Sequence, residues 1–213
     1  MSRRVIGVDE VGRGSLAGPV VAAAVVLPDE LYPWVEEIRD SKKLTPKKRE
    51  ELEDLILHHS IYAVREGSAF QIDEVNILQA TLWTMRKCVG EVCEQLGEEQ
   101  REYMVLVDGT HKIPNLELPQ EAIKGGDNIH KAIGAASIIA KVYRDRFMVT
   151  MSQFYPEYGF AKHKGYGTAA HREAIMIHGP CPIHRRTFRG VYEYVKSPDS
   201  VSDYSCEPKI FDY

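Results

Sequence analysis

Short apolar runs alternate along this chain with longer stretches in which apolar residues recur at helical spacing, and this alternation constrains the fold most strongly. The runs predict buried β-strands, and they cover residues 5–8, 20–27, 61–64 and 104–107. The longer stretches predict helices that begin at Thr45 and at Asp73 and helices over residues 130–151 and 168–178. Strands that alternate with helices are typical of an α/β domain.

The length and composition fit one globular domain followed by a tail. The chain has 213 residues, of which 44% are hydrophobic and 27% are charged, so it can bury a sizeable core. Periodic patterns end near Val195, and we expect one domain over residues 1–195 with a small helical segment near its C-terminal end. Residues 196–213 are polar and acidic without periodicity, which predicts a flexible tail.

The cysteine pattern and the N-terminus favour a cytoplasmic location. The cysteines form no C-x-x-C pair, which disfavours zinc, and we expect reduced thiols at Cys88, Cys93, Cys181 and Cys206. The apolar stretch after the basic N-terminus is interrupted by Asp9 and Glu10, unlike a secretory signal. The longest apolar run, residues 20–27, is too short to cross a bilayer.

Acidic residues stand at the ends of several apolar runs. Asp9 and Glu10 follow the first run, Asp108 follows residues 104–107, and Asp127 follows residues 123–126. Because α/β sheets place their ligands at strand ends, these carboxylates can converge. A cluster of carboxylates is costly without a counterion, and ligands that are all oxygen suit Mg²⁺ or Mn²⁺. The pattern therefore predicts a divalent-metal site suited to phosphodiester hydrolysis.

A simpler interpretation of these acids stays open. Acidic residues after strands are common as helix caps and turn residues. Adjacent residues of a strand point to opposite faces, so Asp9 and Glu10 share a site only if the strand bends there. Gly12 and Gly14, which follow directly, are compatible with such a bend.

Two glycine-containing segments are candidates for substrate binding. The backbone N–H groups of the segment Gly12-Arg13-Gly14, together with its arginine, could hold a phosphate or a sugar hydroxyl, and the alternative is a simple tight turn. Its spacing to Gly18 differs from that of a dinucleotide-binding fingerprint. Tyr166 lies between two glycines and could stack on a sugar or a base, although a buried core tyrosine is the alternative.

Basic residues are clustered although the net charge is −4. Such clusters could follow a phosphate backbone, and ordinary solvated surface is the alternative. They comprise Lys42, Lys43, Lys47, Lys48 and Arg49, then Lys162, His163 and Lys164, and finally His184, Arg185, Arg186 and Arg189.

Taken in order, these segments resemble the motifs of the ribonuclease HII family. The resemblance extends from about residue 4 to residue 192, and the ordered set is far more specific than any one motif. Its segments are Gly7–Gly14 with Leu16–Val20, Asp40–Leu44, Val107–Gly109, Gly126-Asp127 with Ala135–Ile138, Ala140–Val142 and Arg144-Asp145, Lys164–Thr168, and His184–Arg186 with Phe188.

The resemblance implies a fold, an activity and a catalytic set. The fold would be a ribonuclease H-like mixed β-sheet flanked by helices, with a C-terminal helical segment. The activity would be endonucleolytic hydrolysis of RNA in RNA–DNA hybrids and cleavage 5′ of ribonucleotides embedded in duplex DNA. Two Mn²⁺ or Mg²⁺ ions would assist it and leave 5′-phosphate and 3′-hydroxyl ends. The catalytic and metal-binding residues would be Asp9, Glu10, Asp108 and Asp127.

The resemblance also implies how substrate is recognised. Gly12, Arg13 and Gly14 would contact the 2′-hydroxyl side of the ribonucleotide, and that hydroxyl distinguishes RNA from DNA. Tyr166 would pack on the next sugar, while Lys42 and Lys43 would meet backbone phosphates. We expect a monomer that binds RNA–DNA hybrid or ribonucleotide-containing DNA and no membrane.

Some positions depart from the family pattern. Lys124 stands one residue further from Asp127 than in the commoner Lys-Gly-Asp version, and residues 128–131 also differ. Asp127 keeps its spacing to Ala135, which supports its assignment. The terminus Ile210–Tyr213 has a faint similarity to replication-clamp-binding segments, and an unstructured tail is the alternative.

Three other functions compete with this interpretation. A general metal-dependent DNA nuclease would have no 2′-hydroxyl for Arg13 and Tyr166 to recognise. A non-catalytic hybrid-binding protein would have no reason to face phosphates with carboxylates. A nucleotide-binding regulatory domain is disfavoured by the glycine spacing.

Overall fold

The computed structural model of the chain describes residues 4–30 and 32–195. These residues form two compact units whose segments interleave in the sequence. Unit 1 contains residues 4–11, 21–30, 32–66 and 81–142. Unit 2 contains residues 12–20, 67–80 and 143–195. The predicted tail, including the terminus Ile210–Tyr213, lies outside the described residues.

The strands form one mixed sheet, which confirms the predicted α/β class. The order is β3-β2-β1-β4-β5 across five strands. Strand β1 is antiparallel to β2 and parallel to β4, and β4 is parallel to β5. Strand β5 was not among the predicted strands. The bounds are β1 Arg4–Val11, β2 Val20–Val26, β3 Ile61–Gly67, β4 Tyr103–Asp108 and β5 Gln120–Ile123.

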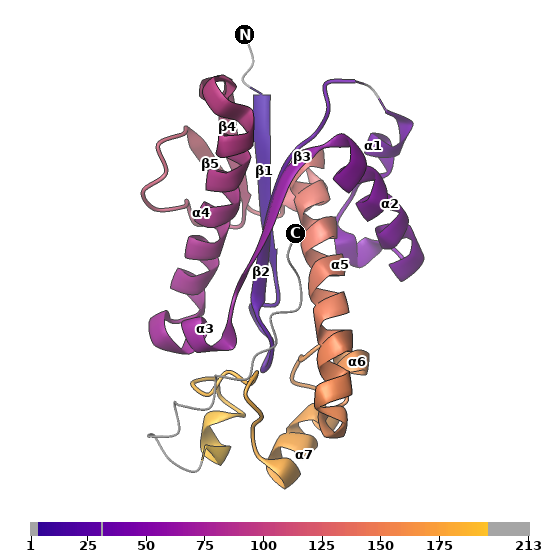
Figure 1. Ribbon diagram of the computed structural model, residues 1–213, viewed down its shortest axis with the longest axis vertical. Coiled ribbons are helices and arrows are strands. Elements are labelled where there is room, and N and C mark those ends of the chain that lie inside the picture. Colours follow the sequence, from indigo (N-terminus) through magenta and orange to yellow (C-terminus); the bar gives the residue numbers. More distant parts are fainter. Residues whose placement is uncertain (1–3, 31, 196–213) are drawn as a thin grey trace. The chain divides into compact units, whose positions relative to one another are not determined.

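Helices occupy most of the remaining described chain (Figure 1). The α-helices are α1 Pro33–Glu37, α2 Pro46–His59, α3 Ala69–Val75, α4 Ile77–Leu96, α5 Lys131–Phe154, α6 Phe160–His163 and α7 Ala169–His178. Short 3₁₀ helices are η1 Ser41–Lys43, η2 Gly97–Glu102, η3 Gly126–Asn128, η4 Pro156–Tyr158 and η5 Tyr192–Tyr194.

The start of the second predicted helix was wrong, because two helices occupy that stretch. Ser68 caps α3 through a reciprocal capping box with Gln71. Asn76 then takes a left-handed φ of 71°, which ends α3. The Asn76 side chain accepts hydrogen bonds from the backbone N–H groups of Leu78 and Gln79, at 3.0 and 3.1 Å, and so starts α4. Capping therefore divides one apolar pattern into two helices.

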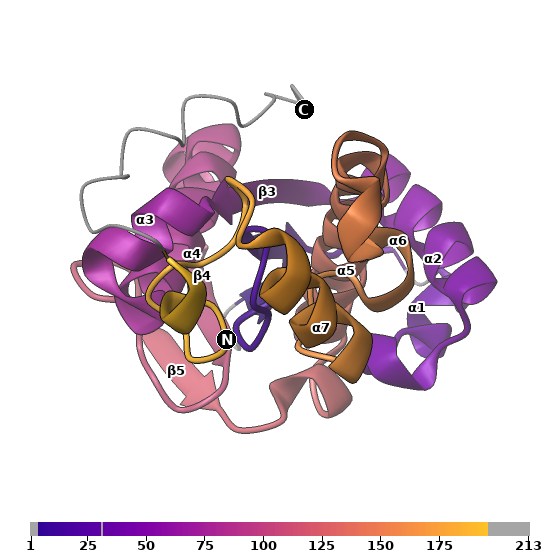
Figure 2. The same ribbon diagram turned by 90° about the horizontal axis from the view of Figure 1, so that it is seen from below.

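Unit 1 is a sheet with helices on both faces. Every residue of β2 is buried, as expected of a strand covered on both sides. Helix α5 crosses β1 at Gly7, where an added Cβ would lie 2.2 Å from the backbone carbon of Ala132. Cys88 of α4 donates from its thiol to the Ala22 carbonyl of β2 at 3.2 Å. Figure 2 shows α4 and α5 on opposite sides of these strands.

Unit 2 has an apolar core of its own. The C-terminal part of α5 contributes Phe147, Met148 and Met151, and α7 contributes Ala174 and Ile175. Tyr158 and Phe160 stack within this cluster with ring centroids 5.4 Å apart. This is the C-terminal helical segment that the sequence predicts.

The structure also bears on the predictions about membrane spans and reduced cysteines. No helix in residues 4–30 and 32–195 is long and apolar enough to span a membrane. Of the cysteines within those ranges, Cys88, Cys93 and Cys181 are free thiols.

Candidate active site

Asp9 and Asp108 lie on neighbouring parallel strands of unit 1. Val8 of β1 is in register with Val107 of β4, so each aspartate follows one member of that pair. Asp9 is 5% exposed, whereas Asp108 is half-buried. The structure therefore places Asp9 and Asp108 at matching positions on adjoining strands.

Strand β1 does not end before its acids, which corrects the prediction that it stops at Val8. It continues to Val11, and Asp9 and Glu10 stay in register with Ala23 and Ala22 of β2. Adjacent strand residues face opposite sides, and accordingly Asp9 is buried while Glu10 is only partly so. The backbone N–H of Glu10 donates to Asp9 Oδ1 at 2.7 Å.

Asp9 is in a costly environment for a charge. Burial, followed by the nearby carboxylates of Glu10 and Asp108, raises the pKa of Asp9 well above its ordinary value. A hydrogen bond with the Ser137 side chain acts in the opposite direction. The Ser137 hydroxyl also lies 3.0 Å from that of Ser41. Sequence reasoning included Ser137 only within the segment Ala135–Ile138 of the family resemblance and missed this contact.

Asp108 holds the loop that carries Asp127. Its Oδ1 accepts a hydrogen bond from the Gly126 N–H at 2.7 Å. Gly125 takes a left-handed φ of 70°, and a Cβ on Gly126 would lie 2.6 Å from Ile133 Cδ1. Glycine suits both positions of this loop, and the additional glycine accounts for the longer spacing to Lys124, whose side chain is exposed.

Asp127 is buried beside other acids. Its pKa is raised by burial and then by the carboxylates of Asp40 and Asp108, while a hydrogen bond from Asn128 and the charge of Lys42 lower it. The Asn128 amide donates to Asp127 Oδ1 at 2.8 Å. The departure from the family pattern at residue 128 thus supplies a direct partner to the candidate ligand.

Two lysines of the first basic cluster lie near these acids. Lys42 is close enough to affect the pKa of Asp127, and the Lys43 ammonium donates to the side-chain oxygen of Asn128. Both lysine side chains are exposed. The structure therefore brings the two predicted phosphate-contacting residues to the carboxylates.

The carboxylate site fits a hard divalent cation by its chemistry. All four candidate ligands offer oxygen only, and a bound cation would relieve the repulsion that raises the pKa of Asp9. Within the described ranges, no three His, Cys, Asp or Glu side chains are already gathered as a ready set of ligands.

The segment Gly12–Gly14 belongs to unit 2, and Arg185 holds it by hydrogen bonds to its carbonyl groups. The guanidinium of Arg185, 0% exposed, donates to the carbonyls of Gly12 at 2.7 Å, Arg13 at 2.8 Å and Gly18 at 3.0 Å. Across a trans peptide the carbonyl and the next N–H point in opposite directions. The N–H groups of Arg13 and Gly14 therefore point away from Arg185, at residues that are exposed.

Tyr166 lies beside this segment within unit 2. It forms a β-bridge with Ser15, and its ring lies 5.6 Å from the guanidinium carbon of Arg144. The residue is 38% exposed, so the alternative of a core tyrosine is wrong. Arg144 is itself 0% exposed and lies against Gly12, where a Cβ would be 2.2 Å from Arg144 Nε.

Two buried arginines were therefore missed by sequence reasoning. Arg185 and His184 were grouped with a surface cluster for phosphate binding, but both are 0% exposed and face the interior of unit 2. Arg144 donates to the carbonyls of Ala17, Pro19 and Lys164. Both arginines stand among other charged and polar residues, so no local pattern signalled their burial.

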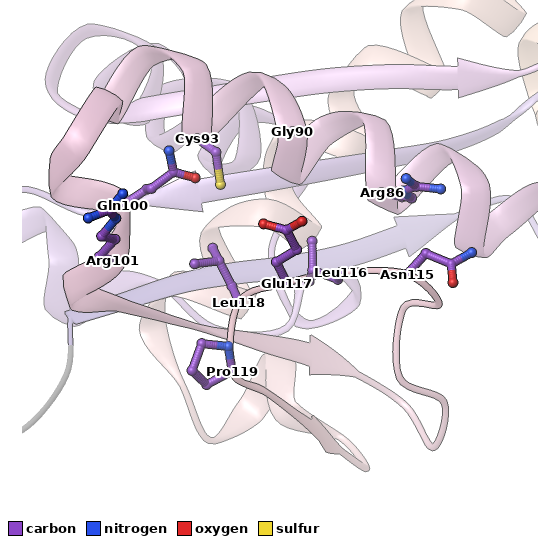
Figure 3. A pocket seen from close by; sticks show the side chains of 10 residues that line it. All are labelled: Arg86, Gly90, Cys93, Gln100, Arg101, Asn115, Leu116, Glu117, Leu118 and Pro119. Carbon is purple, nitrogen blue, oxygen red and sulfur yellow. The ribbon is translucent and has the colours of Figure 1, made fainter.

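A pocket of about 580 Å³ in unit 1 is separate from the carboxylates (Figure 3). It lies between α4 and the segment before β5, and Glu117 points into its middle, between Arg86 and Arg101. None of its lining residues is a predicted site residue. They are Arg86, Gly90, Cys93, Gln100, Arg101, Asn115, Leu116, Glu117, Leu118 and Pro119.

Comparisons with known proteins match this arrangement. The family model described as ribonuclease HII matches residues 6–191. A ribonuclease HII from Geotalea uraniireducens is 52% identical over 196 residues, which cover 92% of this chain and 87% of the relative. A chain in the PCNA:RNase HII complex from Archaeoglobus fulgidus is 27% identical with a TM-score of 0.69, covering 87% of this chain and 95% of the other. Bst ribonuclease HIII in complex with Mn²⁺ shares the fold at 19% identity and a TM-score of 0.72, covering 91% of this chain and 69% of the other.

Proposed function

Because the chain belongs to the ribonuclease HII family, we propose that it is an endonuclease that hydrolyses the RNA strand of RNA–DNA hybrids. It is a phosphodiester hydrolase that requires divalent metal ions. The observation that carries this proposal is the buried Asp9 beside Asp108, with a pKa raised by burial and by neighbouring carboxylates. Such an arrangement is unfavourable in a protein with no cation to bind.

The metal-binding residues in this proposal are Asp9, Glu10, Asp108 and Asp127. Two Mn²⁺ or Mg²⁺ ions held there would stabilise the charge that develops on phosphate oxygens during hydrolysis. Ser137 orients Asp9 by a hydrogen bond, and Gly126 orients Asp108 in the same way. These contacts fix the direction in which each carboxylate presents its oxygens.

Lys42 and Lys43 contact the substrate backbone. Their exposed ammonium groups lie near the acids, where a phosphodiester would otherwise meet only negative charge. Contacts of this kind position a nucleic acid without reading its sequence. They would also make binding of the hybrid weaken as salt concentration rises.

Cleavage occurs 5′ of a ribonucleotide, including one embedded in duplex DNA, and leaves 5′-phosphate and 3′-hydroxyl ends. The outward N–H groups of the Gly12–Gly14 segment, with the Arg13 side chain, recognise the 2′-hydroxyl. Tyr166 packs its partly exposed ring on the next sugar. Support comes from Arg185, which fixes the carbonyls of Gly12 and Arg13 and thereby the direction of those N–H groups.

Two competing functions are less well supported. A general DNA nuclease would not need the Arg13 and Tyr166 recognition elements that neighbour each other in unit 2. A binding protein without catalysis would gain nothing from the buried, mutually repelling acids of unit 1.

The wider assignments remain predictions of the same proposal. Residues 1–195 act as one catalytic domain, the protein is a monomer, and it works in the cytoplasm. The terminus Ile210–Tyr213, outside the described residues, binds a replication clamp. The solved complex in which an Archaeoglobus fulgidus ribonuclease HII accompanies PCNA supports a clamp contact, without identifying the segment that makes it.

A cleavage assay on a uniform RNA–DNA hybrid tests the proposed activity. We expect wild-type protein to cut the RNA strand with Mn²⁺ or Mg²⁺ and not with chelator. Asp9→Asn should bind the hybrid as well as wild type but cut at least about 10³-fold more slowly, since it loses a metal ligand. Cleavage by Asp9→Asn at the wild-type rate would remove Asp9 from the catalytic set.

A further inference from the structure

A chain of hydrogen bonds runs through buried side chains of unit 2 and ends at the backbone of Tyr166. The Cys181 N–H lies 2.9 Å from His184 Nδ1. His184 Nε2 lies 3.0 Å from His171 Nε2, and His171 Nδ1 lies 3.0 Å from the Tyr166 carbonyl oxygen. Both histidines are 0% exposed.

The chemistry of its two ends fixes the direction of this chain. A backbone N–H can only donate, so His184 Nδ1 accepts from Cys181 and the His184 proton is on Nε2. A carbonyl can only accept, so the His171 proton is on Nδ1 and points at Tyr166. His184 therefore donates to His171, and both rings are neutral. An additional proton on His171 Nε2 would face the His184 Nε2–H, and one on His184 Nδ1 would face the Cys181 N–H.

Burial agrees with the neutral state of both rings. It lowers the pKa of His171 to about 4 and that of His184 to about 3. At the pH of an ordinary assay the chain of hydrogen bonds is thus intact.

The loop that ends at Tyr166 needs such support. Lys164 and Gly165 have left-handed φ values of 52° and 82°, and residues other than glycine, such as Lys164, rarely adopt this conformation. Each carbonyl of the loop is held: that of Lys164 by Arg144 at 2.8 Å, and that of Gly165 by the Leu16 N–H at 2.8 Å. The Tyr166 carbonyl accepts from His171 and also from the Thr168 N–H at 2.8 Å.

We propose that His171 and His184 are positioning residues that set the orientation of Tyr166 toward the sugar of the substrate. This inference rests on the proposed packing of Tyr166 against that sugar. His171 fixes the peptide that follows Tyr166, and His184 fixes the tautomer with which His171 does so. An apolar pair would fill the same space without a directed contact to Tyr166.

Substitutions at His171 separate the directed contact from packing. In His171→Asn the amide nitrogen takes the place of Nδ1 and keeps a donor for the Tyr166 carbonyl. His171→Leu fills similar space and has no donor. His178→Asn is the matched control, because His178 is an exposed histidine of the same helix α7.

The test is a double-mutant cycle with Tyr166→Ala on a DNA duplex that carries one ribonucleotide. We expect His171→Leu to lower kcat/KM about tenfold in the wild-type background and less than about twofold in the Tyr166→Ala background. His171→Asn should stay within about threefold of wild type, and His178→Asn should equal it. Mn²⁺ affinity, measured by calorimetry, should be the same in all variants because the carboxylates belong to unit 1.

Different failures have different meanings. Equal losses from His171→Leu in both backgrounds, or full activity of folded His171→Leu, would overturn the inference while leaving the proposed function intact. Full activity of Tyr166→Ala would overturn the role of Tyr166 and the inference with it. If His171→Leu does not fold, ¹⁵N spectra of wild-type imidazoles decide: protonated His171 Nδ1 and His184 Nε2 support the inference, and either opposite tautomer overturns it.

Discussion

The buried pair His171 and His184 should make the protein lose stability as pH falls from 8 to 5. Burial is the main cause of the lowered pKa values, about 4 for His171 and about 3 for His184. His171 is lowered further by the charges of His163 and Arg172, and His184 by that of His171. In the unfolded chain both rings return to the ordinary value of 6.5.

The size of the loss follows from these values. Below pH 6.5 the unfolded chain takes up protons that the folded protein does not, so the free energy of unfolding falls with pH. At pH 5 each histidine contributes a loss of about 2 kcal/mol relative to pH 8, or about 4 kcal/mol for the pair. The loss continues until the folded pKa values are passed. It is a large part of the roughly 5–15 kcal/mol that stabilises a domain.

Urea unfolding followed by circular dichroism at pH 8, 7, 6 and 5 measures this loss. The reference is the double variant His171→Asn with His184→Gln, which cannot take up these protons. Asp9 and Asp127, whose pKa values are raised, act in the opposite direction in both proteins and cancel in the comparison. Wild type should lose about 4 kcal/mol more than the double variant, and His178→Asn should behave as wild type. A difference below about 1 kcal/mol would refute the reasoning.

Three further predictions, the last with a matched control substitution, test separate parts of the account. Arg13→Ala should reduce the preference for a ribonucleotide over a deoxyribonucleotide at least about tenfold in competitive cleavage, with a smaller effect on total binding; an unchanged preference would contradict its role. Asp9→Asn should raise the free energy of unfolding of metal-free protein, because burial and the neighbouring carboxylates disfavour the charge that it removes, and equal or lower stability in urea would contradict this. Gly7→Ala should lower the free energy of unfolding by about 3 kcal/mol or more, because its Cβ would meet the Ala132 backbone at 2.2 Å. Gly90→Ala, which has open space around it, is the control and should leave the free energy of unfolding unchanged or raise it. Equal effects of the two substitutions in urea unfolding would contradict the close packing at Gly7.

Much of the fold was predictable because local sequence and tertiary structure agree. Thr45 and Thr168 cap α2 and α7 as the sequence indicates. The apolar runs became strands, although β1 extends three residues further through its acids. Strand β5 carries no continuous apolar run and forms because β4 offers it a parallel edge, which no local pattern reveals.

The candidate acids were also predictable, and their partners were not. Asp9 and Asp108 each follow an apolar run, and those two runs form adjoining parallel strands in register. Ser137 contacts Asp9 from a segment far away in the sequence. Asn128 contacts its neighbour Asp127 at a position where this chain departs from the family pattern. The burial of Arg144 and Arg185 depends on carbonyls turned inward by loops, and residue type alone indicates a surface position.

The most direct test of the central claim uses a labelled DNA duplex that carries one ribonucleotide, incubated with Mn²⁺, with Mg²⁺ or with chelator. A matched all-DNA duplex and the Asp127→Asn variant are the controls. The account predicts a metal-dependent cut immediately 5′ of the ribonucleotide, absent from both controls. Equal cutting of the all-DNA duplex would contradict it and indicate a general nuclease, and cutting by Asp127→Asn at the wild-type rate would remove the fourth carboxylate from the site.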